Sequence, residues 1–300
     1  MNTHKSNFKW ASQASSLRLG HLACALLWMS LVVQQHASAT IIAVDPFNYS
    51  PVGSPVAGNG ANGSFGFSDN WHGDNSFMIA AGNLPSPIPV LMPVSNSVTV
   101  AAFGGNRDIN REFSQPLGVD NTTAYFSFVM QPQGIVGDGA FQGWFGFDLR
   151  GGLRQITVGK DSFHGTFSLQ DNLGDQPVQT NVPIVSGASH FFVLGVSFLP
   201  GNDVYKLYID PPAGQPEPAT PAASLNFDLQ SVPTLGLTGP GAYGFDELRI
   251  GTTWNDVTSV PEPATGLLCI AAIASVAAFF AGVRPTSKHP DALNAGALWG

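Results

Sequence analysis

Between residues 40 and 258 the chain alternates apolar and polar residues, or runs apolar for about the length of one strand. Gly, Pro, Asn and Asp separate these stretches, and none of them keeps a helical period. Such a pattern predicts β-strands joined by turns. The predicted strands are residues 40–47, 97–103, 123–131, 141–150, 153–160, 164–171, 190–199, 203–211 and 243–251. Strands without intervening helices favour an antiparallel β-sandwich over a parallel sheet.

The alternation also predicts which side chains form the core. Phe126 and Phe128 share one face of their strand, because side chains in a strand alternate between its two faces. We expect both to be buried. In the 141–150 strand the same rule puts three phenylalanines on the core face and Trp144 on the outer face; the three are Phe141, Phe145 and Phe147.

The segment from Ser50 to Pro93 fits this pattern least well. It is rich in Gly, Asn and Pro, which predicts a long loop that covers one face of the sandwich or builds a binding surface. It also carries large apolar residues that need a partner to pack against, namely Phe65, Phe67, Trp71, Phe77, Met78 and Ile79.

The N-terminal residues have the three parts of a signal peptide. Basic residues precede a short apolar run from Leu22 to Val33, and the small-x-small sequence Ala37-Ser38-Ala39 follows it. We predict a signal peptide over residues 1–39, cleavage between Ala39 and Thr40, and an exported mature chain. The two cysteines, Cys24 and Cys269, lie outside residues 40–258, so we expect the exported domain to fold without disulfides.

A second apolar run, from Ala264 to Val283, lies near the C-terminus. It is 20 residues long and uncharged, and it is apolar or small on all sides, whereas a core helix has a polar face. This length suits a bilayer-spanning helix, so we predict a transmembrane helix over 264–283. The sequence Pro261-Glu262-Pro263 directly precedes the run, and a polar tail over 287–300 follows it.

Charge narrows the partners of the exported domain. Residues 40–258 hold 15 Asp and 3 Glu against 5 Arg and 2 Lys, a net charge of −11. Such a surface repels phosphate backbones, so we expect no nucleic-acid partner. The aspartates stand among Gly and Asn, a composition typical of turns and also of calcium sites.

The carboxylates do not have the arrangement of a glycosidase. Glycosidases use a pair of acids, and some enzymes built from β-sheets place both on one face of a strand. The domain contains three glutamates, Glu112, Glu217 and Glu247, and we expect the adjacent Asp246 and Glu247 to point to opposite faces. The three histidines lie far apart, and no Gly-x-Ser-x-Gly sequence is present. We therefore predict that the protein is not an enzyme.

Binding remains the leading hypothesis for the domain. Aromatic rings stack on sugars, Asp and Asn bond sugar hydroxyls, and a calcium ion often fixes the loops of such sites. For Trp144, packing under a neighbouring loop is the alternative. The candidate glycan-binding residues are Trp71, Asp69, Asn70 and Trp144, and the candidate calcium ligands are Asp74 and Asn75.

Two resemblances follow from these motifs. The stretch from Ala43 to Trp71, together with "FDELRIGTTWNDVT", resembles laminin-G-like, concanavalin-A-like jelly-roll domains, which implies that fold for residues 40–258. The matching positions are Phe47, Tyr49, Trp71, Asp246, Glu247, Arg249, Gly251 and Trp254.

Residues 259–286 resemble the PEP-CTERM sorting signal of Gram-negative bacteria that secrete exopolysaccharide. The resemblance implies that Pro261, Glu262 and Pro263 are read by an exosortase while the helix holds the protein in the inner membrane. The chain departs from the pattern because the usual arginine cluster is reduced to Arg284 with Lys288. The pentapeptide "PEPAT" also occurs at 216–220, where no apolar span follows and a proline-rich loop explains it.

Together these features predict an exported, surface-sorted, non-enzymatic protein of a bacterial exopolysaccharide or envelope system. Its jelly roll would bind glycan or matrix, and its final location would be the cell surface or the medium. The alternatives are a structural matrix protein without a small ligand and a divergent glycan-active enzyme.

Overall fold

The computed structural model describes residues 40–60, 63–87, 95–100, 103–134, 143–173 and 176–259. Within these residues the chain forms fifteen strands and a five-residue helix, α2 (Trp254–Thr258). The strands are β1 (Ile41–Asp45), β2 (His72–Gly73), β3 (Met78–Ala80), β4 (Ser97–Val100), β5 (Asp108–Leu117), β6 (Thr122–Pro132), β7 (Phe145–Gly151), β8 (Arg154–Lys160), β9 (Thr166–Asp171), β10 (Val178–Pro183), β11 (His190–Phe198), β12 (Asp203–Ile209), β13 (Ala223–Phe227), β14 (Val232–Thr238) and β15 (Tyr243–Gly251).

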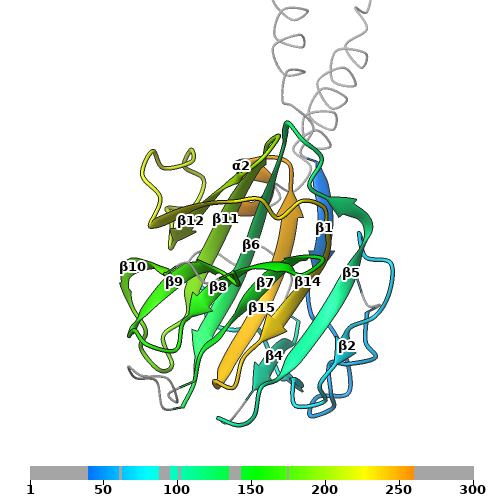
Figure 1. The fold of residues 1–300 in the computed structure, drawn as a ribbon. Coiled ribbons are helices and arrows are strands. Elements are labelled where there is room, and N and C mark those ends of the chain that lie inside the picture. The colour runs from blue at the N-terminus through cyan, green and yellow to red at the C-terminus, as the bar shows by residue number, and fades with distance from the viewer. Residues whose placement is uncertain are drawn as a thin grey trace, which may run out of the picture. The chain divides into compact units, whose positions relative to one another are not determined.

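The strands form two antiparallel sheets that pack face to face (Figure 1). The first sheet has the order β13-β12-β11-β6-β15-β4-β3, with β1 paired to β15, and the second has the order β10-β9-β8-β7-β14-β5-β2. The prediction of an all-β antiparallel sandwich is confirmed. Strands β7 to β10 follow one another in the chain and lie side by side in the second sheet, so their outward side chains form one continuous surface.

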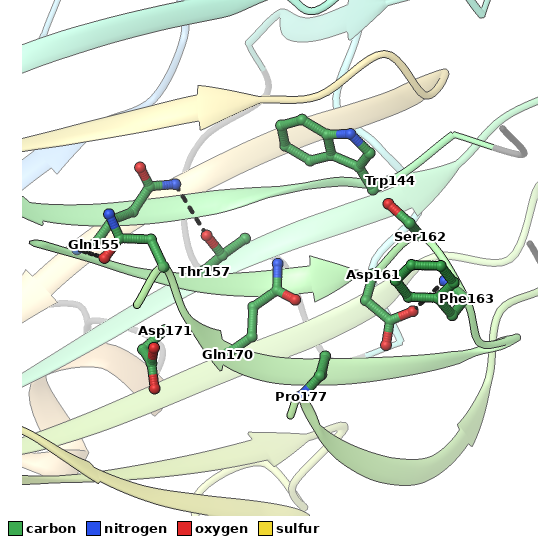
Figure 2. A pocket seen from close by; sticks show the side chains of 10 residues that line it. Trp144, Gln155, Thr157, Asp161, Ser162, Phe163, Gln170, Asp171 and Pro177 are labelled. Carbon is green, nitrogen blue, oxygen red and sulfur yellow. Dashed lines mark hydrogen bonds between the residues drawn. The ribbon is translucent and has the colours of Figure 1, made fainter. Parts of the chain in front are cut away.

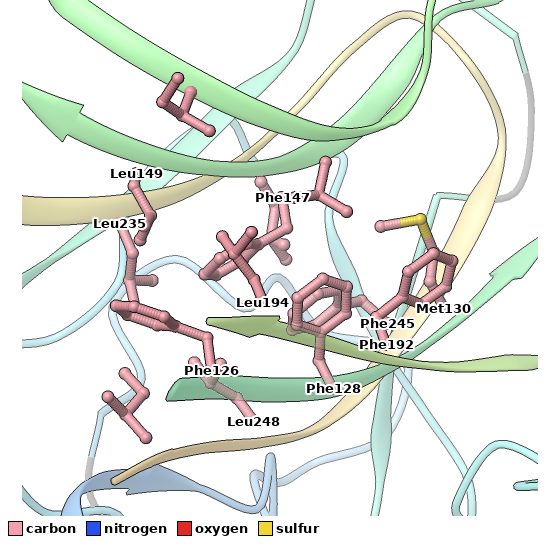
Figure 3. Packing of buried hydrophobic residues seen from close by; sticks show 14 of the residues in the cluster. Phe126, Phe128, Met130, Phe147, Leu149, Phe192, Leu194, Leu235, Phe245 and Leu248 are labelled. Atoms are coloured by element: carbon pink, nitrogen blue, oxygen red, sulfur yellow. The ribbon is translucent and has the colours of Figure 1, made fainter. Parts of the chain in front are cut away.

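The core between the sheets is rich in aromatic rings (Figure 3). Phe128 of β6 packs against Phe147 of β7 with 4.7 Å between ring centroids, and Phe126 lies beside it. All four predicted core phenylalanines that the structure describes are fully buried, namely Phe126, Phe128, Phe145 and Phe147. Phe141 lies outside the described residues, so its predicted burial stays a prediction.

Several strands were not predicted because their sequences lack a clean alternation. In β5 the inward positions include Arg111, which is only 3% exposed and replaces an apolar residue in the pattern. In β14 a proline and a glycine interrupt the apolar run. The other missed strands, β2, β3, β10 and β13, are short or largely polar.

The glycine-rich segment from Ser50 is more ordered than the predicted loop. It contains β2 and β3, and it buries Trp71, Phe77 and Ile79 in the core. Phe67 stacks on Phe113 of β5 with 5.6 Å between centroids, whereas Phe65 remains half exposed. The expectation that these apolar residues pack is therefore correct for most of them, and the predicted loop contains two short strands.

No helix among the described residues is long and apolar enough to cross a membrane. The predicted signal peptide up to Ala39, the Pro261-Glu262-Pro263 motif, the transmembrane helix over 264–283 and the polar tail over 287–300 all lie outside the described residues. These assignments stay predictions.

Candidate functional site

A cleft of about 240 Å³ lies on the outer face of the second sheet (Figure 2). Its floor comes from β8 and β9, where Gln155, Thr157 and Gln170 alternate with core residues such as Ile156 and Leu169. The alternation of a strand therefore points these polar side chains away from the core. The described residues that line it are Trp144, Gln155, Thr157, Asp161, Ser162, Phe163, Gln170, Asp171, Asn172 and Pro177.

Two aromatic side chains belong to the lining. Trp144 directly precedes β7 and is half-buried, and Phe163, in the turn after β8, is 64% exposed. The indole Nε1 of Trp144 has no hydrogen-bond partner in the part of the chain that the structure describes. Exposed rings next to polar groups suit contact with the apolar faces of sugars.

Some polar side chains of the cleft are hydrogen-bonded to each other, and others are available to a ligand. The hydroxyl of Thr157 donates to Asp148 Oδ1 at 2.7 Å, and its oxygen accepts from Gln155 Nε2 at 3.0 Å. Ser162 and Gln170 make no side-chain hydrogen bond to any other described residue. Their hydroxyl and amide groups can therefore bond a ligand.

Asp161 organises the turn that carries Phe163. Its Oδ1 accepts the backbone N–H groups of Phe163 at 2.6 Å and His164 at 2.8 Å, and its Oδ2 contacts His164 Nδ1 at 2.9 Å and accepts from Gln179. Burial opposes ionisation of this carboxyl, but these hydrogen bonds outweigh burial and lower its pKa. Asp161 is therefore a fixed anion that holds the rim of the cleft.

Asp171 adds a second negative charge to the lining. It is 8% exposed, and its Oδ1 accepts the Leu173 N–H at 2.7 Å. Its Oδ2 is buried and has no hydrogen-bond partner among the described residues. The lining contains no Lys or Arg beside these two aspartates, so the cleft disfavours anionic ligands.

The prediction that Trp71 binds a glycan is wrong. The residue is fully buried, so neither face of its ring can stack on a sugar. Its Nε1 donates to Asp45 Oδ2 at 2.8 Å, and the same oxygen accepts from Tyr49 at 2.5 Å and Arg111 at 2.6 Å. Arg111 in turn donates to the backbone oxygen of Asp69 at 2.8 Å. Trp71 is thus part of a buried polar network that ties the glycine-rich segment to β1 and β5.

The other predicted residues of this segment do not line the cleft. Asp69 pairs with His72 at 2.8 Å, and Asn70 is exposed. Asp74 Oδ1 accepts the Ser76 N–H at 2.6 Å, and the hydrogen bonds from Ser76 lower the pKa of Asp74. Within the described ranges no three Asp, Glu, His or Cys side chains gather as metal ligands would. Calcium at Asp74 and Asn75 stays a prediction.

Asp246 and Glu247 depart from the regular alternation expected for them. The pairing of β15 with β6 shifts register between Asp246 and Arg249, and Glu247 has φ of 56°. Burial raises the pKa of Asp246 to about 8, although the backbone N–H groups of Leu84 and Glu247 donate to it. Both side chains are buried and neither lines the cleft.

Sequence reasoning found one member of the cleft and missed the rest. Trp144 lies outside the core and in the lining, and its role toward a glycan stays a prediction. Gln155, Thr157 and Gln170 were missed because single polar residues on strands are common. Their signal was collective, since they occupy outward positions on successive strands next to Trp144.

No protein-family model matches the sequence, and no curated protein matches it. Among solved structures, the chain is similar to a T. cruzi calreticulin globular domain, at 10% identity and a TM-score of 0.41, covering 70% of this chain and 94% of that one. It is also similar to an endo-1,3-beta-glucanase from Streptomyces sioyaensis at 8% identity and a TM-score of 0.40, covering 72% of this chain and 97% of that one. It is similar to peanut lectin at 10% identity and a TM-score of 0.38, covering 68% of this chain and 98% of the lectin. Such values assign no activity, so the function is argued from the cleft.

Proposed function

We propose that this protein is an exported, non-enzymatic glycan-binding protein that holds an uncharged sugar chain in the cleft beside Trp144 and Phe163. The main support for this proposal is that the two rings lie beside the available polar groups of Ser162 and Gln170 on the outer face of one sheet. Sugars offer apolar faces for the rings and hydroxyls for Ser162 and Gln170. The two aspartates in the lining favour an uncharged chain over a uronic acid polymer.

A binding role is favoured over hydrolysis by the state of Asp161. A glycosidase needs one carboxylic acid with a raised pKa to protonate the leaving oxygen. The pKa of Asp161 is lowered instead, and both of its oxygens are already engaged. We therefore expect no new reducing ends when a bound glycan is incubated with the protein.

The wider setting is proposed from the sequence. The domain would be a concanavalin-A-like or laminin-G-like jelly roll, as the closing motif in β15 suggests. The signal peptide and the PEP-CTERM segment would place it in a bacterial exopolysaccharide or envelope system. An exosortase would release it from the inner membrane to the cell surface, where polysaccharide is its partner.

Binding of the full chain in mild detergent tests the cleft directly. The probes are laminarin, cellohexaose and dextran as uncharged glycans and polygalacturonate as an acidic one. We expect at least one uncharged probe to bind more tightly than polygalacturonate, and Trp144→Ala to lower its affinity about tenfold through lost stacking. Phe65→Ala removes an exposed ring outside the cleft and should leave affinity unchanged. Equal binding by wild type and Trp144→Ala, or binding to polygalacturonate alone, overturns the proposal.

A further inference from the structure

A chain of hydrogen bonds runs from a buried carboxylate to the floor of the cleft. Asp148 of β7 is fully buried, and its Oδ2 accepts from Arg150 Nη2 at 2.8 Å. Its Oδ1 accepts from Thr157 at 2.7 Å. Thr157 in turn accepts from Gln155 Nε2 at 3.0 Å, the bond drawn in Figure 2. We call these four residues the Asp148 relay. Gln155 and Thr157 line the cleft, whereas Asp148 and Arg150 do not.

The charge of Asp148 fixes the direction of every bond in the relay. An ionised carboxylate only accepts, so the single hydroxyl proton of Thr157 must go to Asp148. The oxygen of Thr157 can then only accept from Gln155, which turns the amide Nε2 toward Thr157. Gln155 Oε1 is left without a donor from any described residue. It is therefore available as an acceptor in a cleft that Gln155 lines.

We propose that Asp148, without touching the ligand, sets the floor of the cleft to accept hydrogen bonds from ligand hydroxyls by fixing Thr157 and Gln155. This inference rests on the proposed glycan binding at the same cleft. Asp148 is thus a positioning residue. The ligand it selects is a chain with free hydroxyl donors at that point.

The surroundings of Asp148 are built to keep the relay in place. Arg150 also donates to both oxygens of Asp108 on β5, which anchors the guanidinium from a second strand. A Cβ on Gly236 would lie 2.5 Å from Arg150 Nη2, and one on Gly146 would lie 2.5 Å from Thr157 Cγ2. Only glycine at these positions leaves room for the two side chains to lie against the sheet.

Protonation of Asp148 would reverse the relay. Oδ2 faces Arg150, so the added proton sits on Oδ1 and donates to Thr157. The Thr157 hydroxyl then donates to Gln155, whose amide turns and presents Nε2 to the cleft. Burial raises the pKa of Asp148 to about 6 against the lowering effect of Arg150 and Thr157. The charged and titratable groups facing it are Arg150 on β7, Asp108 on β5 and Tyr243 on β15.

Asp148→Asn tests the relay, with Asp120→Asn at an exposed turn as the matched control. Asparagine keeps the shape but donates to Thr157, so affinity of the full chain for the tightest-binding uncharged probe should fall about tenfold, the loss of one hydrogen bond. Asp120→Asn changes a carboxyl outside both the relay and the cleft and should change affinity less than twofold. Wild-type affinity should fall as the pH drops through 6, and Asp148→Asn should abolish that step.

A second measurement does not depend on the ligand. In wild-type protein the side-chain amide NMR signals of Gln155 should shift with a midpoint near pH 6, and those of Gln170 should not. Asp148→Asn should remove the Gln155 shift. A Gln155 signal that ignores pH, or equal affinity and pH profile for Asp148→Asn and wild type, overturns the relay while glycan binding stands. If wild type binds none of the probes, the proposed function is overturned. The pH dependence of the Gln155 signal then still shows whether the relay exists.

Discussion

At the scale of single residues, two buried carboxylates give the domain an unusual pH dependence. Burial raises the pKa of Asp246 to about 8 and that of Asp148 to about 6. An unfolded aspartate ionises near 3.9, so above that pH the folded state holds protons that the unfolded state has lost. Stability should therefore fall as the pH rises toward 8, and most of the slope above pH 6.5 comes from Asp246.

Asp246→Asn should remove that slope. Wild type is expected to lose up to about 1.4 kcal/mol of unfolding free energy per pH unit between 6.5 and 8, and the variant should lose much less. Urea unfolding at several pH values measures this, and Asp120→Asn, at an exposed turn, is the control. If wild type is equally stable at pH 6.5 and 8, the carboxyl is ionised in the folded state and this account is wrong.

The aromatic core gives a second prediction at this scale. Phe128 contacts Phe147, Phe192 and Phe245 with centroid distances of 4.7, 5.3 and 5.0 Å. Phe128→Ala should cost roughly 3–5 kcal/mol of unfolding free energy, because the cavity lies between two sheets that cannot both relax. Phe163→Ala removes the same group from an exposed position and should cost far less. A loss under about 1 kcal/mol for Phe128→Ala would contradict the packing seen in Figure 3.

At the scale of elements, the sequence predicts those strands whose inward positions are all apolar. β6 is clearly predicted for this reason, whereas β5 has Arg111 among its inward positions. Trp71 could not be placed from sequence, since its burial depends on Asp45, 26 residues away along the chain. The cleft could not be predicted for a related reason. It forms only when β8 and β9 pair in register beside Trp144, and the sequence of a single strand does not show which strand it pairs with.

The loop between β12 and β13 contains the internal "PEPAT" and is more than a plain proline-rich connection. Tyr125 and Tyr208 donate to Glu217 at 2.7 and 2.5 Å, and Trp254 of α2 donates to the Gln215 carbonyl at 2.8 Å. Burial, together with Glu217, raises the pKa of both tyrosines, which keeps their hydroxyls protonated as donors. Glu217 therefore fastens this loop onto the outer face of the first sheet.

Glu217→Ala should release the loop. Both tyrosine donors lose their acceptor, so local opening should become about tenfold more frequent, as for the loss of one or two hydrogen bonds. Limited proteolysis, with mass spectrometry of cuts between Asp210 and Ala222, measures this. Glu112→Ala, at an exposed position of β5, is the control. An unchanged cleavage rate in the loop would mean that Trp254 holds it alone.

At the scale of the whole molecule, the first copy of "PEPAT" is part of the folded domain. It is fastened to the rest of the domain through Glu217. The second copy, at 261–265, lies outside the described residues. A protease that needs an extended strand would find the first copy blocked by its own fold. The fold of the first copy is thus consistent with the proposal that an exosortase acts at the second.

Sorting should therefore require Glu262 and the apolar run, and should ignore Glu217. Prolines on both sides of Glu262 keep the motif extended, and the run of 264–283 would hold it at a fixed depth in the membrane. Glu262→Ala leaves that run intact, so the protein should accumulate unprocessed in the membrane. Deletion of residues 266–283 should release an exported domain that is never cut at Pro-Glu-Pro. Fractionation of producing cells with an antibody to the domain, and mass spectrometry of its C-terminus, would measure both outcomes.

Glu217→Ala is the matched control, because it alters the same pentapeptide without an apolar run behind it. If Glu262→Ala and wild type share one C-terminal mass and one distribution, the run is a plain anchor and the sorting proposal fails.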